Sequence, residues 1–471
     1  MSNEKYRIEH DSLGEVRVPV DAYYGVQTKR AMDNFHISGI PMSHYPRLID
    51  ALAYVKLAAA EANASLGLLD KDKSRAIARA CEELLSGRLH DQFVVDVMQG
   101  GAGTSANMNA NEVLCNRALE LMGRDKGDYE FLHPLNHVNM SQSTNDVYPS
   151  ALNIALILDI RELMDAMRHL RNAFRAKGAE FADVLKMGRT QLQDAVPMTL
   201  GQEFSAWAVM VGEDVQRLDE AQALVHEINM GATAIGTGLN AHPDYTRTVT
   251  EKLIEATTLQ LVSSPDLVEA TQDTGVYVQL SGVLKRVAVK LSKICNDLRL
   301  LSSGPRCGLN EINLPPMQPG SSIMPGKVNP VIPEVVNQVA FSVVGHDVTI
   351  SMASEAGQLE LNVMEPVIGY SLFQSMNMLR RACLTLADSC VSGITANRER
   401  CREMVEHSIG LVTALNPFIG YEKSAEIAKE AMRTGGSVYA IVLEKGYLSR
   451  EELDDILKPE NMVKPRYLHR P

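Results

Sequence analysis

The sequence predicts a mainly α-helical protein built around a long helix bundle. Two observations predict this fold class. Aromatic residues make up only 5% of the chain, and alanine, leucine, valine and methionine supply most of its apolar side chains, which favours helices. Apolar residues also recur at steps of three and four over long stretches, which is the spacing of one helix face. With 471 residues the chain exceeds the size at which a single core usually divides, so we expect several domains.

Residues 1–142 are predicted to form an N-terminal domain that is mixed but mostly helical. Between residues 11 and 27, glycines and a proline lie among valines and tyrosines, a pattern typical of short strands and turns. Helical patterns follow over residues 52–66 and 71–85. We therefore expect a small strand-and-turn region followed by packed helices.

Residues 143–395 are predicted to form a central domain of long helices. One apolar stripe runs from Leu156 to Phe174 and a second from Leu280 to Leu298. A less regular stripe runs from Phe204 to Leu218, and another helical stretch follows Pro333. One subunit does not need to bury so many amphipathic helices alone, so we expect a bundle and an oligomer.

Residues 396–471 are predicted to form a small C-terminal helical domain. Glycines and prolines are spaced closely there, which limits each helix to a short length. Ser449 is followed three residues later by Glu452, which is the pattern of a capping box at the start of a helix. We see no chemistry that is specific to this domain.

The charge and the cysteine pattern exclude several classes of function. The net charge of −12 argues against nucleic acid or an anionic membrane as a partner, because both need basic patches. The chain begins without the apolar segment of a signal peptide, and no later apolar run could span a bilayer, so we expect a cytoplasmic protein. The seven cysteines include no CxxC pair, which predicts buried free thiols, and the twelve histidines form no metal-binding motif.

The most unusual segment is residues 320–330, which read GSSIMPGKVNP. Two glycines and two prolines forbid regular structure, while two hydroxyls, an ammonium and a carboxamide lie between them. A phosphate-binding P-loop is excluded, because five residues separate Gly320 from Gly326 and Val328 follows Lys327. By spacing alone the segment is either a ligand-holding loop or a plain exposed loop.

Two further polar clusters precede predicted helices. Residues 100–112 lead from glycines through Thr104 and Ser105 into a helical run, and residues 141–146 lead into the helix of the central domain. Free backbone N–H groups at such helix starts favour anions. The alternative is an ordinary helix cap with solvated asparagines. The glycine-rich segment at 231–240 does not match GxGxxG, so a dinucleotide fold is not supported.

Four of these segments, 101–112, 143–146, 188–203 and 320–330, resemble in order and approximate spacing the sequence blocks of the fumarase/aspartase superfamily. The resemblance covers nearly the whole chain. It implies a mostly helical three-domain subunit, a homotetramer with a multi-helix core, and active sites at which three subunits meet. It also implies that the loop at 320–330 is mobile and closes over the substrate.

Within the superfamily the chain looks more like the aspartases than the fumarases. Fumarases typically have a histidine where this chain has Gln191, and the segments at 187–191, 227–233, 308–311 and 361–366 look like those of aspartases. The resemblance implies reversible deamination of L-aspartate to fumarate and ammonia, by anti elimination through an aci-carboxylate intermediate. The alternatives are a fumarate hydratase, which acts on malate, and a non-catalytic structural protein recruited from this scaffold.

The resemblance also assigns roles to individual residues. Ser321 would be the general base that removes the Cβ proton. The substrate-binding groups would be Thr104, Ser143, Thr144 and Ser322 for the β-carboxylate, Thr190, Lys327 and Asn329 for the α-carboxylate, and Asn145 for the amino group. Gln191 is counted with them, but a carboxamide cannot titrate, so it can donate or accept a hydrogen bond and cannot be the acid or base.

A serine base needs support from its surroundings. Its hydroxyl is a very weak acid, and each unit by which its pKa is lowered needs about 1.4 kcal/mol of differential stabilisation. Loop N–H groups and a nearby cation in a closed site would supply this, and Lys327 is the only cation of the loop. No obligatory cofactor is implied, because the β-carboxylate itself accepts the charge. The resemblance allows activation by a divalent cation such as Mg²⁺, although the sequence spells no site for one.

Overall fold

The computed structural model describes residues 5–462, and within them most residues are helical, so the predicted mainly α fold class is confirmed. The chain forms two compact units. The first consists of Met1–Met164, Gln216–Arg286 and Ser342–Met378, and the second of Asp165–Val215, Val287–Phe341 and Leu379–Pro471. The division into three domains at 142/143 and 395/396 stays a prediction.

The first unit begins with the strands and turns that the sequence predicts. Strands β1 (Tyr6–Asp11) and β2 (Gly14–Pro19) form an antiparallel hairpin, and helix α1 (Val26–Asn34) follows. The Arg7 guanidinium fixes the chain after the hairpin, because it donates to the carbonyls of Pro19, Ala22 and Tyr24.

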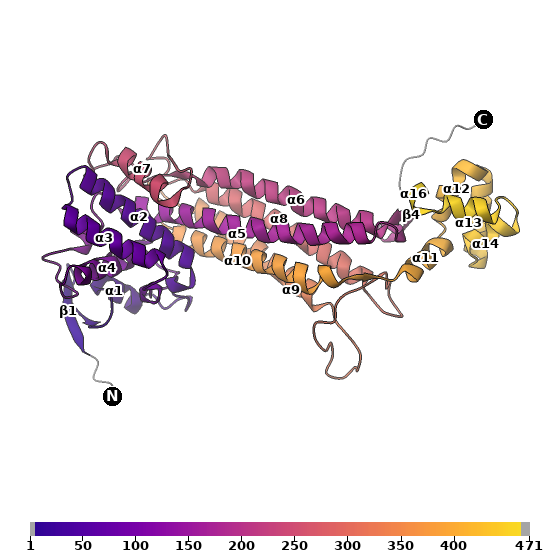
Figure 1. Ribbon diagram of the computed structural model, residues 1–471, viewed down its shortest axis with the longest axis horizontal. Helices are drawn as coiled ribbons and strands as arrows, with labels where there is room; N and C mark the ends of the chain where they lie inside the picture. The colour runs from indigo at the N-terminus through magenta and orange to yellow at the C-terminus, as the bar shows by residue number, and fades with distance from the viewer. Residues whose placement is uncertain (1–4, 463–471) are drawn as a thin grey trace. The chain divides into compact units, whose positions relative to one another are not determined.

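Four helices make up the body of the first unit outside the bundle. They are α2 (Pro46–Ser65), α3 (Lys71–Leu85), α4 (Thr104–Leu121) and α7 (Tyr245–Thr257). Helix α2 packs on α3, α4 and α7, which lie around it in Figure 1. The helical patterns predicted at 52–66 and 71–85 are therefore confirmed. Short helical turns occur at η1 (Met42–His44), η2 (His90–Gln92) and η3 (Pro134–Val138).

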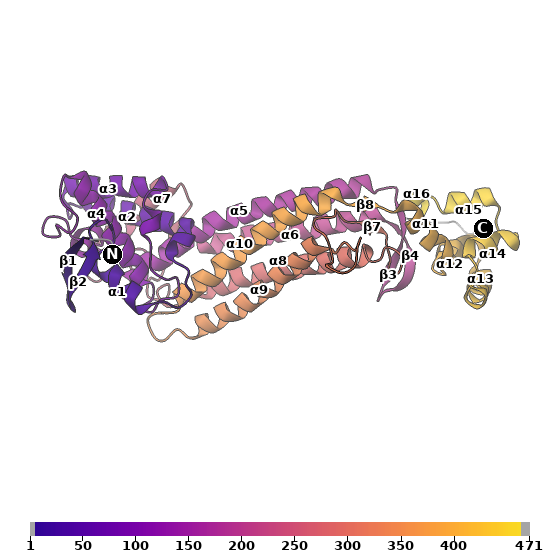
Figure 2. The same ribbon diagram turned by 90° about the horizontal axis from the view of Figure 1, so that it is seen from below.

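The longest helices are α5 (Thr144–Glu180), α6 (Leu200–Val225), α8 (Gly275–Leu301), α9 (Val331–Glu355) and α10 (Glu365–Ser389). Each unit contains a segment of all five, and within each unit these segments run side by side (Figures 1 and 2). None of the helices within residues 5–462 is long and apolar enough to cross a membrane.

The predicted apolar stripes are the buried faces of these helices. The stripe from Leu156 to Phe174 on α5 is at most 1% exposed, and that from Leu280 to Leu298 on α8 at most 2%. In the second unit, Phe174 of α5 meets Trp207 of α6 edge to face, with 5.8 Å between ring centroids. The heptad-like spacing read from the sequence therefore reports real helix packing.

Three short strand pairs accompany the bundle. Strands β3 (Leu185–Thr190) and β4 (Gln193–Thr199) form an antiparallel hairpin in the second unit. The parallel pair is β5 (Glu227–Ile228) with β6 (Val262–Ser263), and the remaining antiparallel pair is β7 (Ile312–Asn313) with β8 (Thr395–Ala396), which follows the turn η4 (Val391–Gly393).

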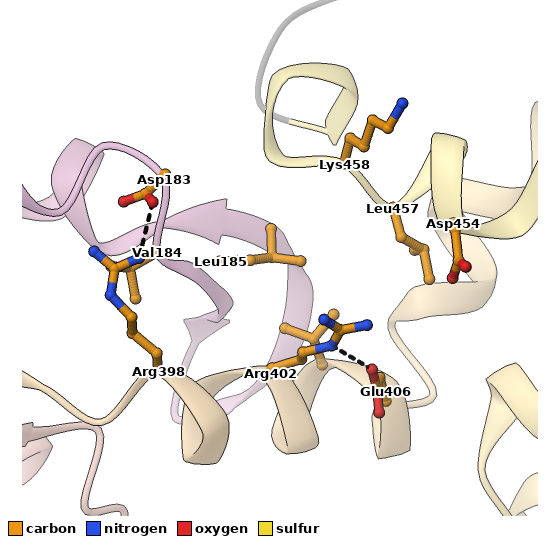
Figure 3. Close-up of a pocket in the computed structure, with 10 residues that line it drawn as sticks. Asp183, Val184, Leu185, Arg398, Arg402, Glu406, Asp454, Leu457 and Lys458 are labelled. Atoms are coloured by element: carbon orange, nitrogen blue, oxygen red, sulfur yellow. Dashed lines mark hydrogen bonds and ion pairs between the residues drawn. The ribbon is translucent and has the colours of Figure 1, made fainter.

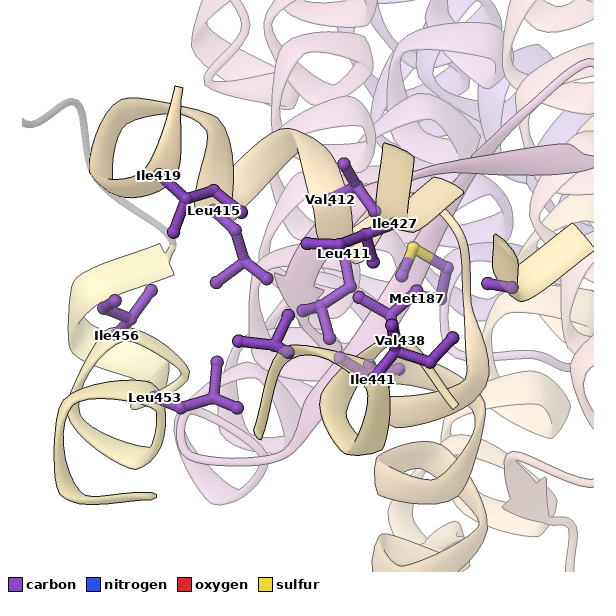
Figure 4. Close-up of a cluster of buried hydrophobic side chains, with 13 residues drawn as sticks. Met187, Leu411, Val412, Leu415, Ile419, Ile427, Val438, Ile441, Leu453 and Ile456 are labelled. Atoms are coloured by element: carbon purple, nitrogen blue, oxygen red, sulfur yellow. The ribbon is translucent and has the colours of Figure 1, made fainter. Parts of the chain in front are cut away.

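The C-terminal part of the second unit is a cluster of short helices with its own core (Figure 4). Buried side chains of this core include Leu415, Ile427, Val438 and Leu453, and Met187 of β3 joins them. The predicted capping box is confirmed, because Ser449 Oγ accepts from the N–H of Glu452 at 3.2 Å and the Glu452 carboxylate accepts from the N–H of Ser449 at 2.8 Å. The helices are α11 (Arg398–His407), α12 (Leu411–Ile419), α13 (Tyr421–Thr434), α14 (Val438–Glu444), α15 (Arg450–Ile456) and α16 (Pro459–Met462).

The cysteines follow the prediction of buried free thiols with one exception. Six of the seven are buried, whereas Cys307 is exposed. The expectation is wrong at Cys307 because this residue lies in the irregular segment between α8 and β7, where no helix face covers it.

Candidate active site

Thr104 is the first residue of α4, as the sequence predicts for Thr104 or Ser105. The chain reaches it through three left-handed residues, Gly101, Ala102 and Gly103, with φ values of 87°, 56° and 90°. Only glycine fits at position 103, because a Cβ there would lie 2.4 Å from the Tyr148 ring. Thr104 itself is exposed, and its hydroxyl donates to the Gly101 carbonyl at 2.7 Å. The turn thus presents a threonine at an open helix N-terminus.

The second hydroxyl cluster forms the start of α5. Ser143 Oγ accepts from the N–H of Asn145 at 3.2 Å, and Asn145 donates through Nδ2 to the Ala234 carbonyl at 2.7 Å. Thr144 Oγ1 accepts from Asn107 Nδ2 at 3.0 Å. Because Asn107 is the donor in that bond, the Thr144 hydroxyl keeps its proton for another acceptor.

The buried carboxylate of Asp146 supports the backbone of this cluster. Its side chain is fully buried, and its Oδ1 accepts from the N–H of Ser143 at 3.0 Å. Its Oδ2 accepts from the N–H groups of Gly231 and Thr233, both at 3.0 Å. Burial raises the pKa of Asp146 to about 7, against the lowering effect of these N–H donors and of Lys56. The glycine-rich segment at 231–240 is therefore part of the support of the Ser143 turn.

Lys56 of α2 places a buried amino group next to the residues that precede the same cluster. It is 0% exposed, and its Nζ donates to Asn139 Oδ1 and to Gln142 Oε1, each at 2.9 Å. Asn139 Oδ1 also accepts from Asn107 Nδ2 at 3.1 Å, and Asn107 in turn reaches Thr144. Burial lowers the pKa of Lys56 to about 7, while Asp146 acts to raise it. A continuous chain of hydrogen bonds thus joins a buried cation to the Thr144 hydroxyl.

The alternative reading of the first cluster as a cap with solvated asparagines is wrong. Asn107, Asn109 and Asn111 are all 0% exposed. Lys56 was not among the predicted site residues, because a single lysine in a helix usually lies on a solvated face. Its signal in the sequence was its position within the apolar run from Ala51 to Ala60, where an ammonium needs a buried partner.

Thr190 and Gln191 lie at the tip of the β3–β4 hairpin. The two-residue turn consists of Gln191 and Leu192, whose φ values are 53° and 64°. Turns of this kind prefer asparagine and glycine, and another residue in this conformation costs about 1–3 kcal/mol. The side chains of Thr190 and Gln191 are exposed, and within the described residues they make no hydrogen bond. The hairpin therefore presents two free polar groups at a strained tip.

Buried ion pairs fix the base of the same hairpin. Glu311, which is 0% exposed, lies 2.6 Å from the Arg189 guanidinium and 3.0 Å from Lys186 Nζ. Lys186 also pairs with Glu203 at 2.6 Å. Burial acts to lower the pKa of Lys186, but the two carboxylates outweigh it and raise the pKa above its usual value. The strands are thus held firmly while the tip stays accessible.

The segment at 320–330 is a loop without helix or strand, as predicted. Ser321 Oγ accepts hydrogen bonds from the backbone N–H groups of Ile323 at 3.2 Å and of Met324 at 3.0 Å. Asn329 Nδ2 donates to the Gly320 carbonyl at 2.6 Å, which ties the two ends of the loop together. Two N–H donors aimed at one hydroxyl oxygen would stabilise negative charge on it.

The predicted site residues fall into two groups. The first unit contains Thr104, Ser143, Thr144 and Asn145, and the second contains Thr190, Gln191, Ser321, Ser322, Lys327 and Asn329. Within the first unit, a hydrogen bond joins Asn145 to Ser143, and Thr144 between them accepts from Asn107. Convergence of both groups on one substrate stays a prediction.

A cavity of about 380 Å³ in the second unit is not the predicted site (Figure 3). Its charged groups are already paired, since Arg398 meets Asp183 at 2.9 Å and Arg402 meets Glu406 at 2.7 Å. None of the predicted site residues lines it. Within residues 5–462, no group of three or more histidine, cysteine, aspartate or glutamate side chains is arranged to hold a metal ion.

The comparisons with known proteins agree with the resemblance read from the sequence. Residues 14–345 match the lyase family, and residues 411–464 match the fumarase C C-terminus. An aspartate ammonia-lyase of Pseudomonas aeruginosa is 61% identical over 98% of both chains. A solved structure titled fumarate lyase:delta crystallin, from Brucella melitensis, is 55% identical, with a TM-score of 0.95 over 98% of this chain and 100% of that one.

A more distant solved structure is the class II fumarase of Schistosoma mansoni. It is 36% identical and superposes with a TM-score of 0.91 over 98% of this chain and 100% of the fumarase chain. The family match exceeds half of the chain, and the relatives are matched over nearly their full length. The chain therefore belongs to the lyase family that includes the aspartate ammonia-lyases and the class II fumarases.

Proposed function

We propose that the protein is an aspartate ammonia-lyase, which converts L-aspartate reversibly to fumarate and ammonia. The observation that carries the proposal is the Ser321 hydroxyl, whose oxygen accepts from two loop N–H groups. Such donors favour the alkoxide over the neutral hydroxyl, which is the form that a serine base needs. The 61% identical relative from Pseudomonas aeruginosa carries the name of this activity.

In the proposed reaction Ser321 removes a proton from Cβ of aspartate. The electron pair of the C–H bond moves into the β-carboxylate, which becomes an aci-carboxylate dianion. Catalysis then depends on groups that bind this dianion better than the ground-state carboxylate. Thr104, Ser143, Thr144 and Ser322 are the proposed donors, and the buried ammonium of Lys56 adds positive potential behind Thr144.

Collapse of the dianion expels the amino group. The electrons of the C–N bond leave with nitrogen, so a protonated substrate amine departs as neutral ammonia and no strong general acid is required. Asn145 orients the amine in this scheme, while Thr190, Lys327 and Asn329 hold the α-carboxylate. Gln191, at the exposed hairpin tip, contributes a hydrogen bond and cannot transfer a proton.

We further propose a homotetramer in which three subunits contribute to each active site. Helix α9 supports this assembly, because it exposes Phe341 (67%), Val348 (55%) and Met352 (69%) at helical spacing. Large exposed apolar side chains along one helix face mark an interaction surface. Residues from the two groups of site residues would then meet across subunit boundaries.

The reaction as proposed needs no obligatory cofactor, because the substrate carboxylate is the electron acceptor. Activation by Mg²⁺ stays a prediction, and titration of the activity with a chelator and then with Mg²⁺ would test it. The cytoplasmic location likewise stays a prediction.

Incubation of the purified protein with fumarate distinguishes the candidate functions. With fumarate and ammonium we expect L-aspartate, and with fumarate alone we expect no product. Malate in the second incubation would replace the proposal with a fumarate hydratase. No product in either would leave the recruited structural protein as the explanation.

Replacement of Gly320 by alanine should impair catalysis without unfolding the protein. A Cβ at this position would lie 2.1 Å from the carbonyl oxygen of Lys327 and 2.8 Å from the N–H nitrogen of Asn329. The loop must shift, and misplacement of reacting groups by about 1 Å can cost about 10²-fold in rate. Steady-state kinetics should show a loss of that order at an unchanged melting temperature. Gly282→Ala is the matched control, because nothing lies within 4 Å of its Cβ position.

A further inference from the structure

A second cavity, of about 230 Å³, lies in the first unit and is lined by carboxylates. Glu227, Glu269, Asp273 and Glu365 contribute to its wall, and no lysine, arginine or histidine does. Burial raises the pKa of Glu269, and the negative charges of Asp273 and Glu227 raise it further. Like charges are thus held close together here, which favours a bound cation.

Glu365, in the first turn of α10, is the most deeply placed of these acids. It is only 5% exposed, and its carboxyl makes no hydrogen bond or ion pair within the described residues. Burial raises the pKa of Glu365 to about 8. A buried acid normally has a partner, since an unpaired one is costly in an apolar surrounding. Glu365 therefore lacks the partner that this cavity could hold.

Neighbouring polar groups do not supply that partner. Tyr277 donates its hydroxyl proton to Asn153 Oδ1 at 2.9 Å, and Asn153 Nδ2 donates to the Glu227 carbonyl at 2.8 Å. Burial raises the pKa of Tyr148 and of Tyr277, and the nearby charge of Glu365 raises both further, so neither hydroxyl brings a positive charge to Glu365. Neither Tyr277 nor Asn153 donates to Glu365, so its carboxyl is open to a ligand that brings its own donors.

We propose that this cavity binds a small ammonium-type cation, held by the Glu365 carboxylate and the acids at the rim. An N–H donor fits better than a metal ion, because within residues 5–462 no three acidic, histidine or cysteine side chains are arranged around one point as a metal requires. An ammonium ion carries four donors and one positive charge, which match a buried carboxylate and its carbonyl neighbours.

The choice of ammonium itself rests on the proposed function, since that reaction releases and consumes ammonia. The position of the cavity fits this role. Asn229 lines the cavity and donates through Nδ2 to the backbone carbonyl of Asn145 at 3.0 Å. Asn145 is the residue proposed to orient the substrate amine. The hydrogen bond from Asn229 to Asn145 therefore joins the cavity wall to the residue that would hold the amine.

Thermal unfolding of the full-length protein tests the proposal without any turnover. The melting temperature is measured just above the pKa of Glu365 in ammonium chloride, with potassium chloride and tetramethylammonium chloride at equal ionic strength as controls. Ammonium should raise the melting temperature by on the order of 1–3 °C more than either control salt once it exceeds its dissociation constant about tenfold. Methylammonium, which keeps three donors, should act like ammonium.

Variants identify the site of the effect. Glu365→Gln keeps the shape but not the charge and should abolish the ammonium-specific shift, whereas Glu130→Gln, an exposed glutamate outside the cavity, should keep it in full. If Glu365→Gln does not fold, Glu269→Gln should reduce the shift instead. Equal shifts in all three salts, or a full shift in both cavity variants, would overturn the proposal. Failure to form aspartate from fumarate and ammonium would overturn the proposed function instead. The melting-temperature measurement does not depend on that activity.

Discussion

Ser321→Ala is expected to reduce the rate of fumarate release from L-aspartate by about 10²- to 10⁴-fold, the usual contribution of a general base. The physical reason is that the mechanism leaves no other base in the loop, since Ser322, Lys327 and Asn329 bind the substrate carboxylates and a carboxamide cannot titrate. The hydroxyl lost accepts only from loop N–H groups, so the melting temperature and the assembly should not change. Fumarate absorbance measures the rate directly.

The control for this variant is Ser86→Ala. Ser86 is also exposed, and its hydroxyl donates only to the Glu83 carbonyl of its own helix, so turnover should be unaffected. Undiminished turnover in Ser321→Ala would remove the serine from the mechanism. A fall in both turnover and melting temperature would show that the hydroxyl mainly holds the loop.

Lys56→Met is expected to lower kcat/KM for L-aspartate by about 10- to 100-fold, mainly through kcat, because loss of a charge-assisted hydrogen bond costs about 1.5–3 kcal/mol and this one supports the binding of the dianion. Lys56 does not reach the substrate in this account. It acts through Asn139 and Asn107 on the direction of the Thr144 hydroxyl. Lys56→Gln, which keeps one donor without the charge, should lie between Met and the wild type. Lys71→Met, at an exposed lysine, is the control.

A double-mutant cycle separates this positioning role from a merely structural one. If Lys56 acts through Thr144, replacement of Lys56 should reduce kcat/KM much less in a Thr144→Val background than in the wild type. The hydroxyl that Lys56 directs is already absent from that background. Independent losses would make the two effects additive. Additivity, together with a parallel fall in melting temperature for every Lys56 variant, would contradict the positioning role.

The helices were the part of the fold that sequence patterns predicted well. The pattern at 71–85 coincides with α3, and the stripes of α5 and α8 are buried as their spacing required. Both features depend on local periodicity, which the sequence states directly. The starts of α4 and α5 beside hydroxyls were also predicted, because glycine and hydroxyl residues signal a helix start locally.

The support of the site could not be predicted in the same way. The chain Lys56, Asn139, Asn107, Thr144 joins residues that are up to 88 positions apart in the sequence, and no local pattern reports such contacts. Asn107 is fully buried, which the pattern of a helix cap in the sequence does not show. Glu365 was read as part of an aspartase-like segment, but nothing in that segment shows that its carboxyl is buried without a partner.

Subunit mixing tests most directly the central claim that hydroxyls of one chain and the loop serine of another act on one substrate. Ser321→Ala and Thr144→Val subunits, each expected to be strongly impaired alone, are dissociated, mixed in equal amounts and reassembled. If a site takes its loop and its Thr144 from different subunits, about one quarter of the sites contain both wild-type residues, and about one quarter of wild-type activity should return. Activity no higher than that of the separate variants would contradict the shared site.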